Sequence, residues 1–437
     1  MNLENRLTNP SVTESSAYLS MSHLLGANAD QPAISVTCAP SAVIPITVPH
    51  DAPLDPLYPI VTKLKVNTWE LALSDTGVLH KFSDIPTGLQ SGFLCGLENY
   101  SLSCTSILPN HFTSKEDKEF VIMKYTTEIE EGRLSRGYDP NKLFSLIGHF
   151  RTTPLAVITQ GSGKKRIIVN HSFPRNKNSI ALNTLLRDPT EKIIIDPTTT
   201  SINTIINSKK FQCTWGSFSE CYLLVADTPE GMEAAVFDID SAFCNIPIHP
   251  PTCCFLAVMI KGLIHLDNVL NFGASSSPGI FGRVADAMVK ILLSKGIEAV
   301  IKWVDDFIIF RFPKGRAVNG TYSFNYSSDL VWDITTDLGW PWAPSKFVDF
   351  SSMFLYIGFC WDLAAKQVEL PENKKTKYLD RISNWTRGSL LAIKDAESVI
   401  GTLNHVCLVV PGGHSHLVSL YEFRGGFKSG CLNQIKH

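Results

Sequence analysis

Two adjacent acids interrupt an apolar run in the second half of the chain. Asp305 and Asp306 follow Ala299-Val300-Ile301 and precede Ile308-Ile309. Such a β-branched run predicts a buried strand, where carboxylates rarely occur without a partner. If the acids occupy the turn of a hairpin, both carboxylates lie at one sheet edge, where like charges repel and favour a bound cation. The alternative is a surface turn, because Asp is a common turn former.

A second candidate acid ends another apolar stretch. Ala234 to Phe237 predict a strand that stops at Asp238, and Phe243 follows five residues later. Strand ends are where α/β architectures commonly place catalytic groups. Asp240 has an equal claim by composition, because strand alternation sends its side chain the same way as that of Asp238. Spacing alone therefore leaves the two acids unranked.

A basic hairpin is predicted upstream of these acids. Two apolar runs are joined by a glycine-containing tip that carries Lys164 and Lys165, and Arg166 begins the second run. Such a hairpin is suited to gripping a polyphosphate, and a guanidinium at its root can form paired bonds to phosphate oxygens. The alternative is a solvated hairpin whose lysines only keep it soluble.

A run of small residues lies between the two acidic motifs. The sequence Asn-Phe-Gly-Ala-Ser-Ser-Ser-Pro-Gly-Ile-Phe at 271–281 leads into a segment with apolar residues at helical spacing. Small residues let a ligand or a base pair approach the backbone closely. An ordinary loop before a core helix would explain the helix, but not so long a run of small residues.

Composition limits the class of protein. The chain has 437 residues, 44% of them hydrophobic, and a net charge of −2, so nucleic-acid contacts would need local basic patches. The eleven cysteines form no Cys-x-x-Cys motif, which favours a reducing intracellular setting, with cytoplasm and nucleus unresolved. No leader or membrane-length apolar run is present, so membrane insertion is not expected.

The chain is expected to divide into four segments. Residues 1–57 are rich in small polar residues and predict a disordered tail, and 58–142 predict a helical region. The strands, acids and small-residue loop lie in 143–370, and a basic helical pattern begins after 371. Near the end, several potential zinc ligands fit no zinc-module spacing, so metal binding is not expected there; they are His405, Cys407, His414, His416 and Cys431.

In this order, the motifs resemble the reverse-transcriptase domain of retroelements. Three successive palm motifs of that family match Asp238 with Phe243, the Phe272-Gly273 and Ser277-Pro278 loop, and Val304-Asp305-Asp306. The segment ending in Lys346 resembles the one that carries the family's palm lysine, and 354–359 resembles its primer-grip hairpin.

The resemblance runs from about Gly132 to Pro411 and is closest to the polymerases of tyrosine-recombinase (DIRS-type) retrotransposons, with gypsy-type elements next. It implies an α+β right-hand polymerase, with fingers and a ferredoxin-like palm in 143–370 and a helical thumb or connection-like segment in 371–437. The implied reaction is RNA-directed DNA synthesis with Mg²⁺ (or Mn²⁺), deoxynucleoside triphosphates and an RNA or DNA template-primer.

The resemblance also assigns roles to residues. Asp238 and Asp305 would bind the metal ions with help from Asp306, which ranks Asp238 above Asp240. Lys346 would neutralise or protonate the pyrophosphate. Phe243 would lie under the sugar and exclude a 2′-hydroxyl by steric clash. The nucleotide-binding set as a whole would be Arg166, Phe243, Phe272, Gly273, Ser277 and Pro278.

Several departures from the family pattern leave alternatives open. Trp303 stands where Tyr or Phe is usual, Asn170 replaces an acid often found after the fingers arginine, and Thr159 falls where some relatives place a second lysine. The chain ends where relatives continue into ribonuclease H, so a truncated element is expected. A decayed or co-opted scaffold that binds nucleic acid without polymerising is the second hypothesis, and another two-metal phosphoryl-transfer enzyme is the third. Template specificity and oligomeric state stay open.

Overall fold

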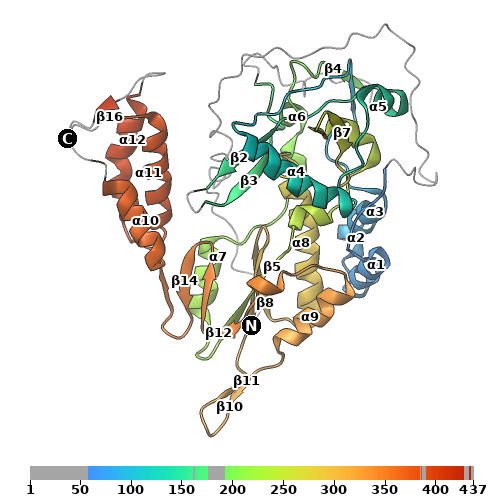
Figure 1. Ribbon diagram of the computed structural model, residues 1–437. Helices are drawn as coiled ribbons and strands as arrows, with labels where there is room; N and C mark the ends of the chain where they lie inside the picture. Colours follow the sequence, from blue (N-terminus) through green and yellow to red (C-terminus); the bar gives the residue numbers. More distant parts are fainter. Residues whose placement is uncertain are drawn as a thin grey trace.

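The computed structural model describes residues 58–160, 163–175, 192–383, 385 and 390–427, and the backbone of 433–434. The predicted tail at 1–57 lies outside this part. Figure 1 shows a central sheet, a lobe above it that contains β2, β3 and α4, and a separate group of helices, α10 to α12. We call these three parts the palm, the fingers and the thumb helices.

The palm is built on a four-stranded antiparallel sheet. Its strands run in the order β12 (Val348–Ser351), β5 (Glu233–Asp238), β9 (Asp306–Arg311) and β8 (Ala299–Trp303). The apolar residues of β5 and β9 alternate between two buried clusters, so the sheet is covered on both faces. This explains why both strands are almost continuously apolar in sequence.

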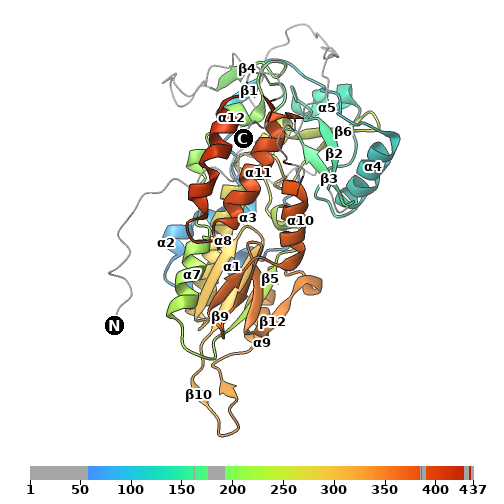
Figure 2. The same cartoon turned by 90° about the vertical axis from the view of Figure 1, so that its left-hand side faces the viewer.

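Helices and a second sheet supply these covers. On one face lie α8 (Ser277–Ser294) and α9 (Ser328–Asp337); on the other lie α7 (Phe218–Asp227) and the hairpin formed by β13 (Met353–Tyr356) and β14 (Phe359–Asp362). Figure 1 shows the palm sheet between α7 and α8, and Figure 2 shows its strands β9, β5 and β12 side by side. The remaining palm strands are β10 (Gly315–Arg316), β11 (Tyr322–Ser323) and β15 (Gln367–Glu369).

The fingers contain the basic hairpin that the sequence predicts and a second hairpin. One joins β2 (Leu155–Thr159) to β3 (Lys165–Val169), and the other joins β6 (Ala257–Ile260) to β7 (Leu263–Leu266). The helix α4 (Lys115–Glu130) starts at Ser114, whose hydroxyl accepts a hydrogen bond from the Asp117 amide, as an N-cap does. It packs on both hairpins. Smaller elements complete this lobe: β1 (Tyr100–Leu102), α5 (Pro140–Ile147), β4 (Ile193–Ile195), α6 (Ile202–Ile205) and η6 (Pro250–Phe255).

The thumb helices follow the palm. They are α10 (Glu372–Ser383), α11 (Ile393–Val406) and α12 (Val418–Gly425). The His405 ring stacks on that of Phe359 with centroids 4.2 Å apart, and His405 Nε2 lies 3.1 Å from the carbonyl oxygen of Ile357. The thumb helices therefore attach to the β13–β14 hairpin. The four predicted domain boundaries themselves stay predictions.

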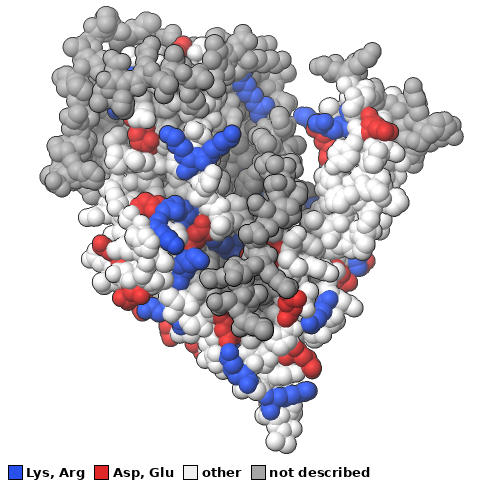
Figure 3. All heavy atoms as spheres, turned by 180° about the vertical axis from the view of Figure 1, so that it is seen from behind, with Lys and Arg blue, Asp and Glu red and all other residues white. Residues whose placement is uncertain are grey.

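The surface charge is mixed, as the low net charge implies. Figure 3 shows Lys and Arg side chains interspersed with Asp and Glu side chains on the face opposite to that of Figure 1. Within the described ranges, no helix combines the length and the apolar character that crossing a bilayer requires.

The N-terminal helices α1 (Val66–Asp75), α2 (Leu79–Phe82) and α3 (Asp84–Ser91) are anchored to the palm by a buried tryptophan. Trp69 is fully buried, its indole nitrogen donates to the Leu338 carbonyl at 3.0 Å, and its ring centroid lies 5.7 Å from that of Trp340. Gly339 has φ +72, and a Cβ there would overlap the Lys63 carbonyl, so this junction requires glycine.

Replacing this anchor tests its contribution to stability. We expect Trp69→Ala to lower the free energy of unfolding by about 3–5 kcal/mol, because it removes a large buried side chain and leaves a cavity. Leu71→Ala on the exposed side of the same helix should change it by less than about 0.5 kcal/mol. Denaturant unfolding measures both; equal effects would contradict the anchor role.

Candidate active site at the end of the palm sheet

The hairpin that carries the two acids has a tight, strained turn. The pair Trp303–Asp306 closes a two-residue loop, so Asp305 lies in the turn and Asp306 begins β9. Val304 has φ +52 at the first loop position, where type II′ turns usually carry glycine. A β-branched residue rarely adopts this conformation, and such strain tends to gather at functional sites.

The strand register brings Asp238 to this hairpin. Asp238 pairs directly with Asp306 across β5 and β9, and the Ile239 amide donates to the Asp305 carbonyl at 3.0 Å. Asp238 is buried, and the other two acids are partly buried. The structure therefore places together the three acids that the sequence singled out.

The crowding of these carboxylates changes their acidity. Burial, and then the charges of Asp305 and Asp238, raise the pKa of Asp306 to about 6. Burial also raises the pKa of Asp305, against the lowering effect of the Lys346 and Arg166 charges. Like charges in a partly desolvated place favour protonation or a bound cation.

Lys346 supplies a cation to this cluster. It ends η7 (Pro344–Lys346), and its Nζ lies 2.6 Å from Asp238 Oδ1. The segment is fixed beside β5 because the Ala343 amide donates to the Asp238 carbonyl at 2.8 Å. The hydrogen bond to Asp238 raises the pKa of Lys346. Lys346 thus neutralises the charge of Asp238; its predicted action on the pyrophosphate stays a prediction.

The donor chemistry of the cluster fits a hard divalent cation, since Mg²⁺ and Mn²⁺ prefer carboxylate oxygens. Among the described residues, however, no three His, Cys, Asp or Glu side chains converge as a ligand set. Lys346 occupies Asp238 Oδ1, so an entering ion would compete with this ammonium for that oxygen. Among the described residues, no set of three potential metal ligands lies near His405 either. Cys431 lies outside the described residues.

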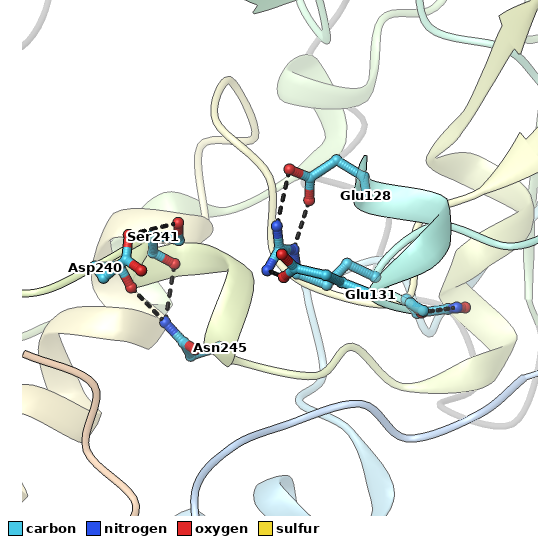
Figure 4. A network of polar contacts seen from close by, with 8 residues as sticks. Glu128, Glu131, Asp240, Ser241 and Asn245 are labelled. Atoms are coloured by element: carbon cyan, nitrogen blue, oxygen red, sulfur yellow. Dashed lines mark hydrogen bonds and ion pairs between the residues drawn. The ribbon is translucent and has the colours of Figure 1, made fainter. Parts of the chain in front are cut away.

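The structure separates Asp238 from Asp240. The strand β5 ends at Asp238, and the backbone turns at Ser241, with φ +53, into η5 (Ala242–Asn245). Asp240 is exposed and accepts a hydrogen bond from the Ser241 hydroxyl at 3.0 Å. Figure 4 shows Asp240, Ser241 and Asn245 together, facing Glu128 and Glu131 at the end of α4. Strand alternation therefore does not extend to Asp240, because β5 ends two residues before it.

The fingers hairpin presents one free guanidinium to the site. Arg166 is exposed, and its charge lowers the pKa of Asp305, so it lies within electrostatic range of the acids. Lys165 instead binds Asp117 of α4, with Nζ to Oδ1 at 3.0 Å. Of the two predicted phosphate-gripping lysines, only Lys164 extends into solvent without this kind of partner.

Two phenylalanines form the wall beside the acids. The Phe243 side chain is only 4% exposed, because the ring of Phe272 lies 4.6 Å from it, centroid to centroid. Phe272 itself is 58% exposed, so it presents the accessible ring. Gly273 has φ +113, and a Cβ there would overlap the Val169 carbonyl of β3. Packing of this loop against the fingers therefore already requires glycine at position 273, whether or not a ligand also approaches it.

The serines that follow have unmet hydrogen-bonding capacity. Ser276 and Ser277 are fully buried, Ser275 is partly buried, and in the described structure none of the three hydroxyl groups has a hydrogen-bond partner. Pro278 lies at the start of α8, where a missing amide hydrogen is tolerated. Buried hydroxyl groups usually have at least one hydrogen-bond partner, which is protein or ordered water.

Sequence reasoning missed the polar residues behind the site. Lys302 and Asp286 form a buried ion pair on the side of the hairpin that faces α8, with Nζ to Oδ1 at 3.0 Å. His171 and Asn271 likewise connect the fingers to the small-residue loop, with Nε2 to Oδ1 at 2.8 Å. A lysine inside the apolar run of β8 was the available signal for the first pair.

Comparison with known proteins is informative at the level of structure alone. No family model matches the sequence, and no curated protein does. A foamy viral protease-reverse transcriptase solved with an RNA/DNA hybrid matches with a TM-score of 0.50 and 15% identity, covering 75% of this chain and 36% of its own. A structure of the foamy viral protease-reverse transcriptase dRH with double-stranded DNA gives a TM-score of 0.49 and 15% identity, covering 87% of this chain and 59% of its own.

The fold is therefore that of a right-hand polymerase. More narrowly, the chain has a reverse-transcriptase-like fold, and it spans about a third of the length of the first of these structures. At such identity the likeness defines the fold alone. The expected fold class is thereby confirmed.

The raised pKa of Asp306 predicts that its charged form, the one that could bind a metal ion, makes the folded state less stable. Its folded pKa of about 6 exceeds the ordinary value of 3.8, so its ionisation destabilises the folded state as pH rises between those values. We expect Asp306→Asn to raise the free energy of unfolding at pH 7 in EDTA by about 1–2 kcal/mol, allowing for solvent screening, and to have no such effect at pH 3.

Denaturant unfolding at both pH values measures this difference. Asp380→Asn, on the exposed surface of α10, serves as the matched control. An Asp306→Asn variant that is less stable than the parent at pH 7 would contradict the electrostatic account.

Proposed function

We propose that the protein is an RNA-directed DNA polymerase that extends a DNA primer on a nucleic-acid template. The observation that carries the proposal is the in-register pair of Asp238 and Asp306 with Asp305 beside it, in a fold shared with a reverse transcriptase. Carboxylates are not needed to form this sheet, and burial penalises them. The solved relative that binds an RNA/DNA hybrid supports nucleic acid as the partner.

The proposed chemistry assigns a task to each side chain. Asp238 and Asp305, assisted by Asp306, would hold Mg²⁺ or Mn²⁺, which when bound stabilises charge on the transferring and leaving phosphoryl oxygens. Arg166 binds the triphosphate of the incoming deoxynucleotide from the fingers side. Lys346, once released from Asp238, neutralises or protonates the pyrophosphate.

The small-residue loop completes the proposed nucleotide site. Phe272 lies on Phe243 and forms the wall against the sugar, and Gly273 fixes that wall against β3. Ser277 and Pro278 begin α8 at the end of the same loop. The retrotransposon origin, and the DIRS type within it, rest on the motif resemblance alone.

One observation favours a second candidate, a reverse-transcriptase-like scaffold that binds nucleic acid without polymerising. Asp238 is paired with Lys346, and no convergent ligand set exists among the described residues. If Lys346 keeps the acids from holding metal, the fold serves binding alone.

Primer extension distinguishes the two candidates. The purified chain should extend a DNA primer on an RNA template with Mg²⁺ or Mn²⁺, and Asp305→Ala should reduce the rate by at least about 1,000-fold, since a metal ligand contributes several kcal/mol. Asp240→Asn is the control and should retain activity. No extension by the parent would favour the scaffold, and an unaffected Asp305→Ala variant would overturn the site assignment.

The sugar wall makes a separate prediction. We expect Phe243→Ala to raise incorporation of ribonucleotides relative to deoxynucleotides by about 10–100-fold, because Phe272 loses the ring on which it packs and the wall recedes from a 2′-hydroxyl. Single-nucleotide incorporation measures the ratio. Phe272→Ala is the informative comparison, since it removes the exposed ring: a change there without one in Phe243→Ala would transfer the role to Phe272.

A further inference from the structure

A short segment, residues 211–216, is wedged between the two elements that carry the candidate site. We call it the strut. A Cβ at Gly279 or Gly282 of α8 would overlap Phe211 or Cys213, and one at Gly216 would overlap Ile301 of β8. At Gly279 the overlap would be with the Phe211 backbone, and at Gly282 and Gly216 with side chains, so each close approach favours glycine. The strut therefore sets the distance between α8 and the hairpin that bears the acids.

Lys302 joins these three parts at one point. Its side chain is 4% exposed, and its Nζ donates to the Thr214 carbonyl of the strut at 2.6 Å and to the Gly282 carbonyl of α8 at 3.3 Å. It also lies 3.0 Å from Asp286 Oδ1 and 4.3 Å from the centre of the Trp215 ring. One ammonium group thus bonds to both the strut and α8.

The strut is in turn bonded to its neighbours. The Thr214 amide donates to Asp286 Oδ2 at 3.0 Å, and the Gly216 amide donates to the Lys302 carbonyl at 2.7 Å. The Tyr356 hydroxyl of β13 donates to the Gly216 carbonyl at 3.0 Å. The network therefore reaches the hairpin that resembles a primer grip.

Stability does not by itself account for a buried lysine at this place. Burial lowers the pKa of Lys302, with Asp286 opposing the change, so the charge is costly to desolvate. Apolar residues of similar volume often pack as well as a buried ion pair, or better. What directed hydrogen bonds add is a single defined arrangement of the elements that they connect.

We propose that Lys302 is a positioning residue that holds the Val304–Asp305 turn in place relative to α8. It lies on the strand that leads directly into that turn, and the strained Val304 needs surroundings that over-determine its conformation. Without this link, β8 would slide against the strut and displace the Asp305 and Asp306 carboxylates. The inference rests on the proposed polymerase function of those acids.

The test compares Lys302→Met with Lys295→Met, a matched change at an exposed lysine after α8. At a temperature well below unfolding, Lys302→Met should lower kcat for primer extension roughly 10–100-fold, as small misplacements of catalytic groups do, with KM for the deoxynucleotide within about twofold. Its half-saturating Mg²⁺ concentration should rise, whereas Lys295→Met should match the parent. Lys302→Arg, which keeps the charge, should restore part of the loss.

Mn²⁺ binding, measured by electron paramagnetic resonance on the same variants, separates this inference from the proposed function. If the parent protein does not polymerise, the proposed function fails. Weaker Mn²⁺ binding by Lys302→Met than by Lys295→Met would still support the positioning role. Equal binding by the two variants would overturn it. If Lys302→Met does not fold, Asp286→Asn takes its place with the same expectations. Loss of thermal stability alone, with normal kcat and metal dependence, would show a merely structural role.

Discussion

The geometry of the candidate site depends on one register pair, Asp238 opposite Asp306 in adjacent antiparallel strands. Two acids in direct cross-strand contact destabilise a sheet, since their charges repel and both lose water. Two features reduce that cost. Lys346 pairs with Asp238, and the raised pKa of Asp306 favours its protonated, uncharged form. The sheet is nevertheless covered by apolar residues on both faces, which supplies the stability that the pair removes.

The two candidate functions, polymerase and binding scaffold, differ in whether Lys346 gives way to a metal ion at Asp238. Lys346 is largely exposed, whereas Asp238 is not, so the lysine is the partner that is free to leave. An entering divalent ion would compete with one ammonium for the same carboxylate. Solvent screens the exposed Lys346 side of this ion pair and reduces its contribution to stability.

The sequence predicted the parts of the site that depend on local pattern. An acid at the end of an apolar strand, two acids at a hairpin turn and a small-residue loop are visible because strand and turn preferences act over a few residues. The ranking of Asp238 and Asp240 was not visible in the spacing, because it depends on where β5 ends and how Ser241 turns. The partners of Lys302 were also hidden, since Thr214 and Gly282 reach it only through tertiary packing. The burial of Phe243 beneath Phe272 has the same origin.

The attachment of the thumb helices has a mechanical consequence. His405 of α11 holds the carbonyl of Ile357, and Lys374 of α10 occupies the space where residue 358 would carry a side chain, so both helices contact the two-residue turn between β13 and β14. Ile357 and Gly358 both have positive φ, a conformation with little freedom to relax. The turn is therefore rigid. A tilt of the thumb helices would move the β13–β14 hairpin, and with it Tyr356, whose hydroxyl is bonded to the strut behind the acids.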